Sequence, residues 1–159
     1  MIWRLPPTEI YTLSLHDALP ICEQTGVTPL LETNGFFCDT AGLRKFMDRI
    51  PSENKGVLWD VHHPYRFHGE KPEQTASNLE GLIRHVHLKD SVLQDGKVSY
   101  RMMGSGDIPV SEALSSLKKM GYDGHLSLEW VKRWYPELQE AGIVFAHYVN
   151  YMNSRMKQL

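Results

Sequence analysis

The chain has few cysteines and no long apolar run, and both absences limit the classes of protein it can be. Two cysteines, Cys22 and Cys38, are too few for a disulfide framework, so we expect a reducing, cytoplasmic location. No apolar run approaches the ~18 residues that a membrane-spanning helix needs, and the first residues do not follow the pattern of a secretion signal. The sequence therefore predicts no membrane partner.

The chain also lacks a dense block of basic residues. Its 17 lysines and arginines against 19 acidic residues give a net charge of −2, which argues against nucleic acid or an anionic membrane as the main partner. No internal repeat of solenoid period is present. With 159 residues and 42% hydrophobic content, the chain can bury a core and fits one domain or part of a larger one.

The first segment does not read as part of a folding unit. Residues 8–21, TEIYTLSLHDALPI, resemble the conceptual translation of a common sequencing-adapter oligonucleotide. We therefore predict that residues 1–21 are an assembly artefact and that native sequence begins near Cys22, with one domain over residues 22–159. The alternative is an ordinary N-terminal helix from Thr8 to Leu19.

Four acidic or imidazole side chains each close a short apolar run. The runs lie at residues 27–32, 57–60, 83–87 and 125–129, and they end at Glu32, Asp60, His87 and Glu129. Side chains alternate between the two faces of a strand. Counting along each run in steps of two predicts that all four end residues point to the same side of the sheet. If the runs are neighbouring parallel strands, the four side chains meet at one rim.

Helix-like segments separate these runs, and the alternation predicts a parallel α/β sheet. A doubly wound sheet would place ligands at one switch point, whereas a (β/α) barrel carries its chemistry at the carboxyl end of every strand. We therefore predict the C-terminal half of a (β/α)8 TIM barrel, with four βα units. Because such barrels have about 250 residues, the chain is expected to be truncated.

Local signals predict the connecting elements. Asp39 or Thr40 begins a helix that Pro51 stops, and a second helix covers about residues 75–82. Residues 62–75 are expected to form a polar loop, which cannot be helical at Pro64 or Pro72. A hairpin is predicted through Asp95-Gly96, followed by a helix capped by Ser111 and ended by Gly121. A final helix is predicted over about residues 136–156. Pro29 does not fit its predicted strand, because proline gives no N–H to a neighbouring strand.

A lone acidic residue at a strand end more often caps a loop than binds a metal. Four such residues on one face of four successive strands favour a metal site instead. Three carboxylates and one imidazole suit Mn²⁺ or Mg²⁺, and Co²⁺ or Zn²⁺ also match this donor set. The predicted metal ligands are Glu32, Asp60, His87 and Glu129.

Five motifs resemble the xylose-isomerase-like TIM barrels, and within them the sugar-phosphate isomerases and epimerases. They are LLETNG at 30–35, WDVHHP at 59–64, HVHLKD at 85–90, GSGDIP at 104–109 and GYDGHLSLEW at 121–130. The resemblance implies the same four metal ligands and a substrate contact from His63, although strand alternation would have favoured His62. It also implies a substrate-contacting arginine, for which Arg101 is the candidate.

The resemblance implies proton abstraction next to the carbonyl of a sugar or polyol. Glu32 and Glu129 would exchange the proton, while the divalent ion stabilises the enediolate. Lys89, on the face of His87, is expected to neutralise an anionic substrate group or to pair with Asp90. Three alternatives stay open: an inosose-type dehydratase, an apurinic-site endonuclease-like hydrolase, and an inactive half-barrel that associates with itself through its strand edges.

Overall fold

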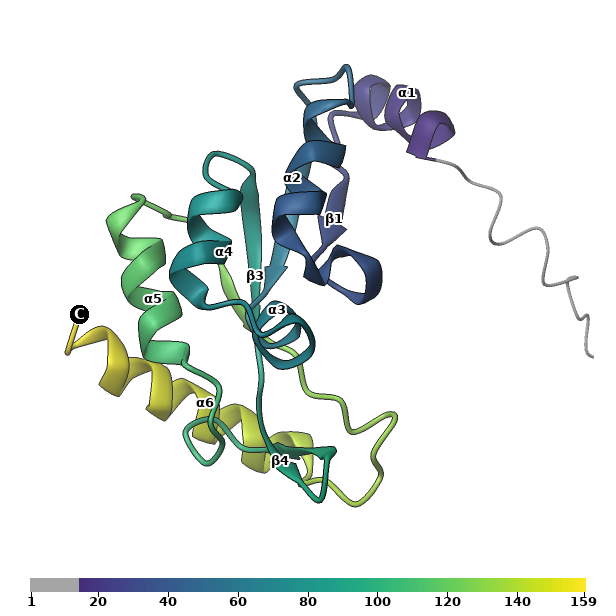
Figure 1. Cartoon of the computed structure of the whole chain (residues 1–159). Helices are drawn as coiled ribbons and strands as arrows, with labels where there is room; N and C mark the ends of the chain where they lie inside the picture. Colours follow the sequence, from purple (N-terminus) through teal and green to yellow (C-terminus); the bar gives the residue numbers. More distant parts are fainter. Residues whose placement is uncertain (1–14) are drawn as a thin grey trace, which may run out of the picture.

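The computed structural model describes residues 15–159 of the chain (Figure 1). The helices are α1 (Leu15–Thr25), a 3-10 turn (Gly35–Cys38), α2 (Thr40–Asp48), α3 (His62–His68), α4 (Pro72–Asn78), α5 (Val110–Lys119) and α6 (Ala141–Met156). The strands are β1 (Leu30–Glu32), β2 (Gly56–Asp60), β3 (Ile83–Leu88), β4 (Asp90–Gln94), β5 (Lys97–Arg101) and β6 (Leu126–Leu128). None of the described helices is long and apolar enough to cross a membrane.

Four of the strands form one parallel sheet in the order β1-β2-β3-β6. The four predicted runs are these strands, and the fold class is α/β as predicted. Strands β4 and β5 pair antiparallel, and the two residues that join them, Asp95 and Gly96, both have positive φ angles, 51° and 73°. This is the backbone of the tight hairpin turn that the Asp-Gly pair predicts.

Pro29 lies before β1 rather than inside it. The strand begins at Leu30, and the carbonyl oxygen of Pro29 accepts a hydrogen bond from the amide of Gly56 at 3.1 Å. Proline lacks a donor but keeps its acceptor, so it fits this position at the strand entrance. The predicted start of the strand at Val27 was therefore wrong.

An irregularity in the pairing of β2 with β3 sets which side chains of β3 face inward. Val57 pairs with Ile83 but the next residue, Leu58, pairs with His85, so the exposed Arg84 is an extra residue in β3. The bulge turns Ile83 towards the helices and His85 to the opposite face. From there the alternation is regular, and Asp60 pairs with His87.

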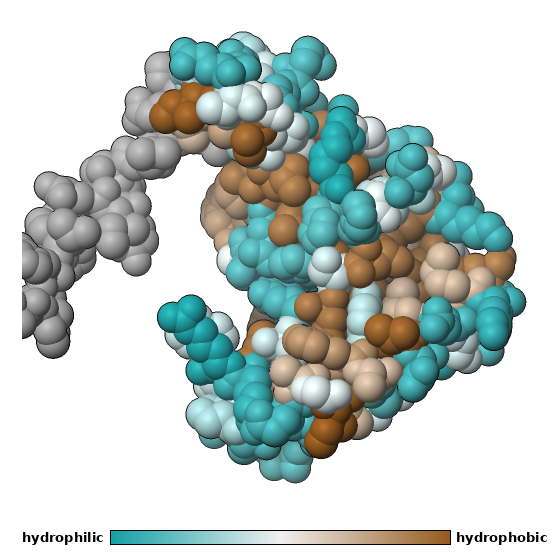
Figure 2. Space-filling view, turned by 180° about the vertical axis from the view of Figure 1, so that it is seen from behind, coloured by the Kyte–Doolittle hydropathy of each residue, from teal (hydrophilic) through white to brown (hydrophobic). Residues whose placement is uncertain are grey.

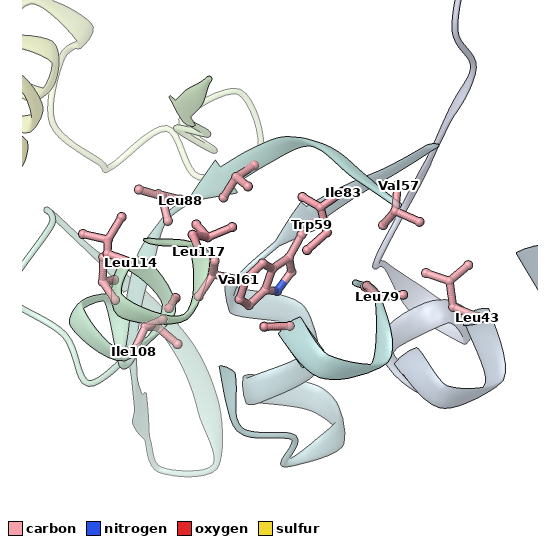
Figure 3. Packing of buried hydrophobic residues seen from close by; sticks show 14 of the residues in the cluster. Leu43, Val57, Trp59, Val61, Leu79, Ile83, Leu88, Ile108, Leu114 and Leu117 are labelled. Carbon is pink, nitrogen blue, oxygen red and sulfur yellow. The ribbon is translucent and has the colours of Figure 1, made fainter. Parts of the chain in front are cut away.

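One face of the sheet packs against helices. The buried side chains of the strands on this face include Val57, Trp59, Val86 and Leu88, none more than 1% exposed. Figure 3 shows Trp59 pointing from β2 into the layer between the sheet and Leu79. Helices α2, α4 and α5 contact one another in that order and cover this face (Figure 1).

The other face carries the polar residues. His85 and Ser127 on adjacent strands share a hydrogen bond of 2.9 Å, and the rings of His85 and His87 lie 5.3 Å apart. Seen from behind, the molecule shows hydrophobic patches interspersed with hydrophilic ones (Figure 2). The predicted division into a helix-covered apolar face and a polar face is confirmed.

Several predicted boundaries were wrong. Both prolines of the expected loop lie in the first turns of helices: Pro64 is the third residue of α3, and Pro72 begins α4. A helix's first amides have no partner within the helix, so proline is tolerated there. Ser111 lies inside α5, whose N-cap is Pro109, and α6 starts at Ala141 rather than near Pro136. Asp39 does cap α2, accepting from the amide of Gly42 at 3.0 Å.

The N-terminal prediction is not settled by the fold. Residues 1–14, which include the first half of the adapter-like stretch and the start of the alternative helix from Thr8, lie outside the described residues. Residues 15–21 belong to α1, which continues to Thr25. A helix at this position is compatible with either origin, so the artefact stays a prediction.

Candidate metal centre

The structure brings the four predicted ligands together. One ligand atom each from Glu32, Asp60, His87 and Glu129 lies within 4.8 Å of the other three. We call these four residues the rim cluster. Glu32 ends β1 and Glu129 follows β6, so the two glutamates enter from the outer strands of the sheet, while Asp60 and His87 enter from the two central strands.

Thr33 ties the ends of β1 and β2 together and thereby fixes two of these side chains. Its hydroxyl accepts from the amide of Asp60 at 3.0 Å and donates to the carbonyl of the same residue at 3.1 Å. Thr33 and Asp60 are both fully buried. The Asp60 carboxylate also accepts the amide of His62 at 3.0 Å, so one of its oxygens caps α3. Sequence analysis missed Thr33, although it directly follows the predicted ligand Glu32.

Two atoms of the rim cluster are buried without a hydrogen-bond partner. Oε1 of Glu32 and Nδ1 of His87 lie 3.9 Å apart, and neither has a partner within the described part of the chain. Unsatisfied buried polar atoms are uncommon, because each costs free energy when removed from water. Their spacing and chemistry fit two ligands of one divalent cation. The residues present therefore fit the metal that the donor set implies.

Lys89 reaches into the same cluster. Its Nζ lies 2.5 Å from Oδ2 of Asp60 and 2.9 Å from Nε2 of His63, and it donates to Oε2 of Glu129. The side chain is only 3% exposed. The predicted pairing with Asp90 is not what the structure shows, since Lys89 pairs with Asp60 and Glu129 instead.

Asp90 holds a backbone turn. Its carboxylate accepts from the amides of Gly104 at 2.8 Å, Gly106 at 2.9 Å and Ile108 at 3.2 Å. A Cβ atom on Gly106 would lie 2.1 Å from Oδ1 of Asp90, so this approach requires glycine. The GSGDIP motif is thus a turn wrapped around Asp90, directly after Lys89.

The two adjacent histidines have different surroundings. Nε2 of His63 lies 3.3 Å from Oδ2 of Asp60 and 4.0 Å from Oε1 of Glu32, so the structure brings His63 to the rim cluster. Nε2 of His62 instead pairs with the hydroxyl of Ser91 at 2.9 Å. Strand alternation fails here because β2 ends at Asp60 and α3 begins at His62.

Burial and charge set the protonation of the cluster. Burial lowers the pKa of His63 to about 4, assisted by the charge of Lys89, and also lowers the pKa of His87. Burial raises the pKa of Asp60 to about 7 against the opposing effect of Lys89. For Glu129, burial acts upward, but the hydrogen bond and charge of Lys89 outweigh it and lower the pKa. Both imidazoles are therefore neutral at pH 7, the form that binds metals.

The predicted substrate arginine lies in the hairpin rather than in the cluster. Arg101 donates to the hydroxyl of Ser99 at 2.5 Å and to the carbonyl of Tyr100 at 2.9 Å, and it has no hydrogen bond to a rim residue among residues 15–159. The guanidinium of Arg66 pairs with Asp107 and donates to the carbonyl of Ser91 at 3.0 Å.

A second group of potential ligands lies at the start of α2 and the end of α3. Single ligand atoms of Asp39, His68 and Glu70 lie within 4.8 Å of one another, and we call these residues the helix cluster. The buried carboxylate of Glu70 accepts from the hydroxyl of Thr75 at 2.5 Å and from that of Thr40. Among the described residues, none of the buried polar atoms that lack a partner belongs to this cluster.

Comparisons with known proteins agree on the fold. The family model described as "Xylose isomerase-like TIM barrel" matches residues 11–147. An uncharacterized protein of Methanocaldococcus jannaschii is 29% identical over 124 residues, which cover 73% of this chain and 41% of that protein.

Two solved structures extend this likeness. A xylose isomerase domain protein from Planctomyces limnophilus has a TM-score of 0.70 at 20% identity, covering 93% of this chain and 55% of that one. An L-ribulose 3-epimerase has a TM-score of 0.73 at 15% identity, covering 99% of this chain and 57% of that one. The chain thus spans about half the length of these proteins, and its four parallel strands match part of their barrels.

Proposed function

Because the chain belongs to the xylose isomerase-like TIM barrel family, we propose that it carries the metal-binding rim of a divalent-metal-dependent sugar or sugar-phosphate isomerase or epimerase. The observation that carries the proposal is the convergence of Glu32, Asp60, His87 and Glu129 at the carboxyl ends of four parallel strands. The carboxyl-terminal rim is where enzymes with this architecture carry their chemistry.

The rim cluster supplies the metal ligands. Glu32, Asp60, His87 and Glu129 would hold Mn²⁺ or Mg²⁺, with Co²⁺ or Zn²⁺ as other occupants that match the donor set. When bound, the ion would act as a Lewis acid on neighbouring substrate oxygens and lower the cost of removing a proton beside a carbonyl. The partnerless Oε1 of Glu32 and Nδ1 of His87 support this assignment.

The two glutamates supply the acid and the base. Glu32 and Glu129 enter from opposite edges of the sheet, so a substrate between them would present one face to each. The lowered pKa of Glu129 keeps its carboxylate ionised at neutral pH, as a general base requires. His63, 3.3 Å from Asp60, would donate to or accept from a substrate hydroxyl.

Proton exchange with solvent tests the proposal. In the longer parent protein that the sequence predicts, we expect deuterium from D₂O to enter a ketose or inosose next to the carbonyl, detected by NMR. Chelation should abolish the exchange, and Glu129→Gln should slow it by about 10²–10⁴-fold. Retained turnover after extensive metal stripping would remove this mechanism. A dehydrated product in place of an epimer would assign the site to the lyase alternative.

For the chain by itself we predict weak or absent turnover. Among the described residues no further strand pairs with β1 or β6, and the chain spans about half the length of the proteins it matches, so these residues do not enclose a substrate by themselves.

A further inference from the structure

Lys89 lies at a junction between two strands of different sheets. It is the single residue between β3, which ends at Leu88, and β4, which begins at Asp90. Asp90 is held in turn by backbone amides of the turn at residues 104–108. The backbone on both sides of Lys89 is therefore fixed, and its side chain points inward on the face of His87. The fold therefore fixes where the side chain of Lys89 begins, while its flexible four-carbon stem leaves the ammonium group able to move.

The ammonium group contacts the same oxygens that a metal ion would need. One oxygen of Asp60, Oδ1, already accepts the amide of His62, which leaves Oδ2 for a cation, and Nζ of Lys89 lies 2.5 Å from that oxygen. Lys89 also donates to Oε2 of Glu129. Two of the four rim ligands thus make their closest charged contact with Lys89.

A divalent metal ion and the ammonium group of Lys89 would repel each other at this position. A divalent ion bound by Asp60 and Glu129 would lie within a few ångströms of Nζ, and like charges at that distance repel strongly in a buried site. A lysine that stays in place would weaken metal binding, whereas a lysine that swings out would leave the four ligands free.

From this geometry we infer that Lys89 is a built-in competitor for the metal: its ammonium group neutralises Asp60 and Glu129 when no ion is bound and leaves the cluster when one binds. The inference rests on the proposed function, because it concerns the same ligands. Metal affinity then depends on the fraction of molecules in which the lysine is out, so removal of the lysine strengthens binding. The expelled ammonium group would lie at the mouth of the site, where an anionic substrate group enters.

Mn²⁺ binding to the metal-free chain tests the competition. Isothermal titration should give Lys89→Met a dissociation constant at least roughly tenfold lower than that of the wild type. Lys89→Arg, which keeps the charge, should not show this gain. Lys132→Met is the matched control, because the ammonium group of Lys132 is also paired, with Glu140 at 3.0 Å, but away from the rim. Equal or weaker Mn²⁺ binding by a folded Lys89→Met protein would overturn the inference.

A second measurement uses the wild type and does not depend on a variant that folds. Amine acylation followed by peptide mass spectrometry should label Lys89 slowly without metal and faster at saturating Mn²⁺, because the side chain leaves its buried position. Unchanged labelling of Lys89 at saturating Mn²⁺ would overturn the inference, as would an absence of Mn²⁺ binding in both wild type and Lys89→Met.

These measurements separate the inference from the proposed function, since neither involves a substrate. If Lys89→Met binds Mn²⁺ more tightly but the parent protein exchanges no sugar proton, the proposed function fails and the competition stands. If chelation stops proton exchange while wild type and Lys89→Met bind Mn²⁺ equally, the proposed function stands and the competition fails.

Discussion

The described part of the molecule contains two clusters of carboxylate and imidazole groups, each close enough to share an ion, in different environments. In each, single ligand atoms lie within 4.8 Å of one another. In the helix cluster both carboxylates have donors, since Glu70 accepts two hydroxyls and Asp39 caps α2. The rim cluster keeps two buried atoms without a partner, on Glu32 and His87. Proximity of ligand atoms alone therefore does not distinguish the two clusters, whereas the partnerless atoms of Glu32 and His87 favour the rim cluster as the metal site.

The largest expected effect separates the two clusters by metal affinity. Glu32→Gln should weaken Mn²⁺ binding by about 1,000-fold, because a unit charge at ~4 Å in a partly buried site is worth about 4 kcal/mol. Glu70→Gln should leave Mn²⁺ affinity unchanged. Isothermal titration measures both, and a loss of affinity in Glu70→Gln would show that the helix cluster binds the ion.

The free energy of unfolding should depend more on the helix cluster than on the rim cluster. Glu70→Ala removes the acceptor for two buried hydroxyls, on Thr40 and Thr75, and should lower the free energy of unfolding by about 3 kcal/mol. Glu32→Ala in the metal-free chain should cost less than about 1 kcal/mol, since Oε1 of Glu32 has no hydrogen bond to lose. Urea unfolding measures both variants, and equal losses would remove the distinction between the clusters.

Acid should destabilise the folded chain through two buried histidines, His62 and His63. The pKa values of His62 and His63 are lowered by burial to about 2 and about 4, against ~6.5 in an unfolded chain. Below pH 6.5 these two histidines bind protons in the unfolded state but not in the folded state, so their contribution to stability falls as pH falls, while the raised pKa of Asp60 acts in the opposite direction. Between pH 7 and pH 5 each histidine should cost about 2 kcal/mol.

Unfolding at pH 7, 6 and 5 measures this loss. His62→Gln should lessen the loss of stability between pH 7 and pH 5 by about 2 kcal/mol, since it removes one of these groups. His68→Gln is the control, because His68 is exposed in the helix cluster and its replacement should change nothing. A His62→Gln protein with the full wild-type dependence would contradict the assignment.

The smallest expected effect concerns the cap of α2. Asp39→Ala removes the hydrogen bond to the amide of Gly42 and should cost about 1 kcal/mol, while Asp39→Ser should cost less because serine also caps helices. Thermal unfolding measures both. Unchanged Mn²⁺ affinity in Asp39→Ala would agree with a purely structural helix cluster, and a lower affinity would contradict it.

Much of the fold could be predicted because its signals are local. The four strands, the hairpin at Asp95-Gly96 and the cap at Asp39 each follow from a few neighbouring residues. Helix α3 could not be predicted in the same way, because Pro64 and its polar neighbours read as a loop. Its helical form depends on contacts made elsewhere, such as the packing of His62 on Tyr100, whose rings lie 5.5 Å apart.

For the candidate site, too, some features follow from the local sequence and others depend on the tertiary structure. The sequence determined which side chains lie at the rim, because alternation along parallel strands sends Asp60 and His87 to one face wherever the strands pair side by side. Tertiary structure alone decided what those side chains meet. Lys89 lies between Asp60 and Glu129 because the turn around Asp90 fixes the backbone beside it, and that turn closes through residues 14 to 18 positions further along the chain. A pattern read along one strand carries no information about such a contact.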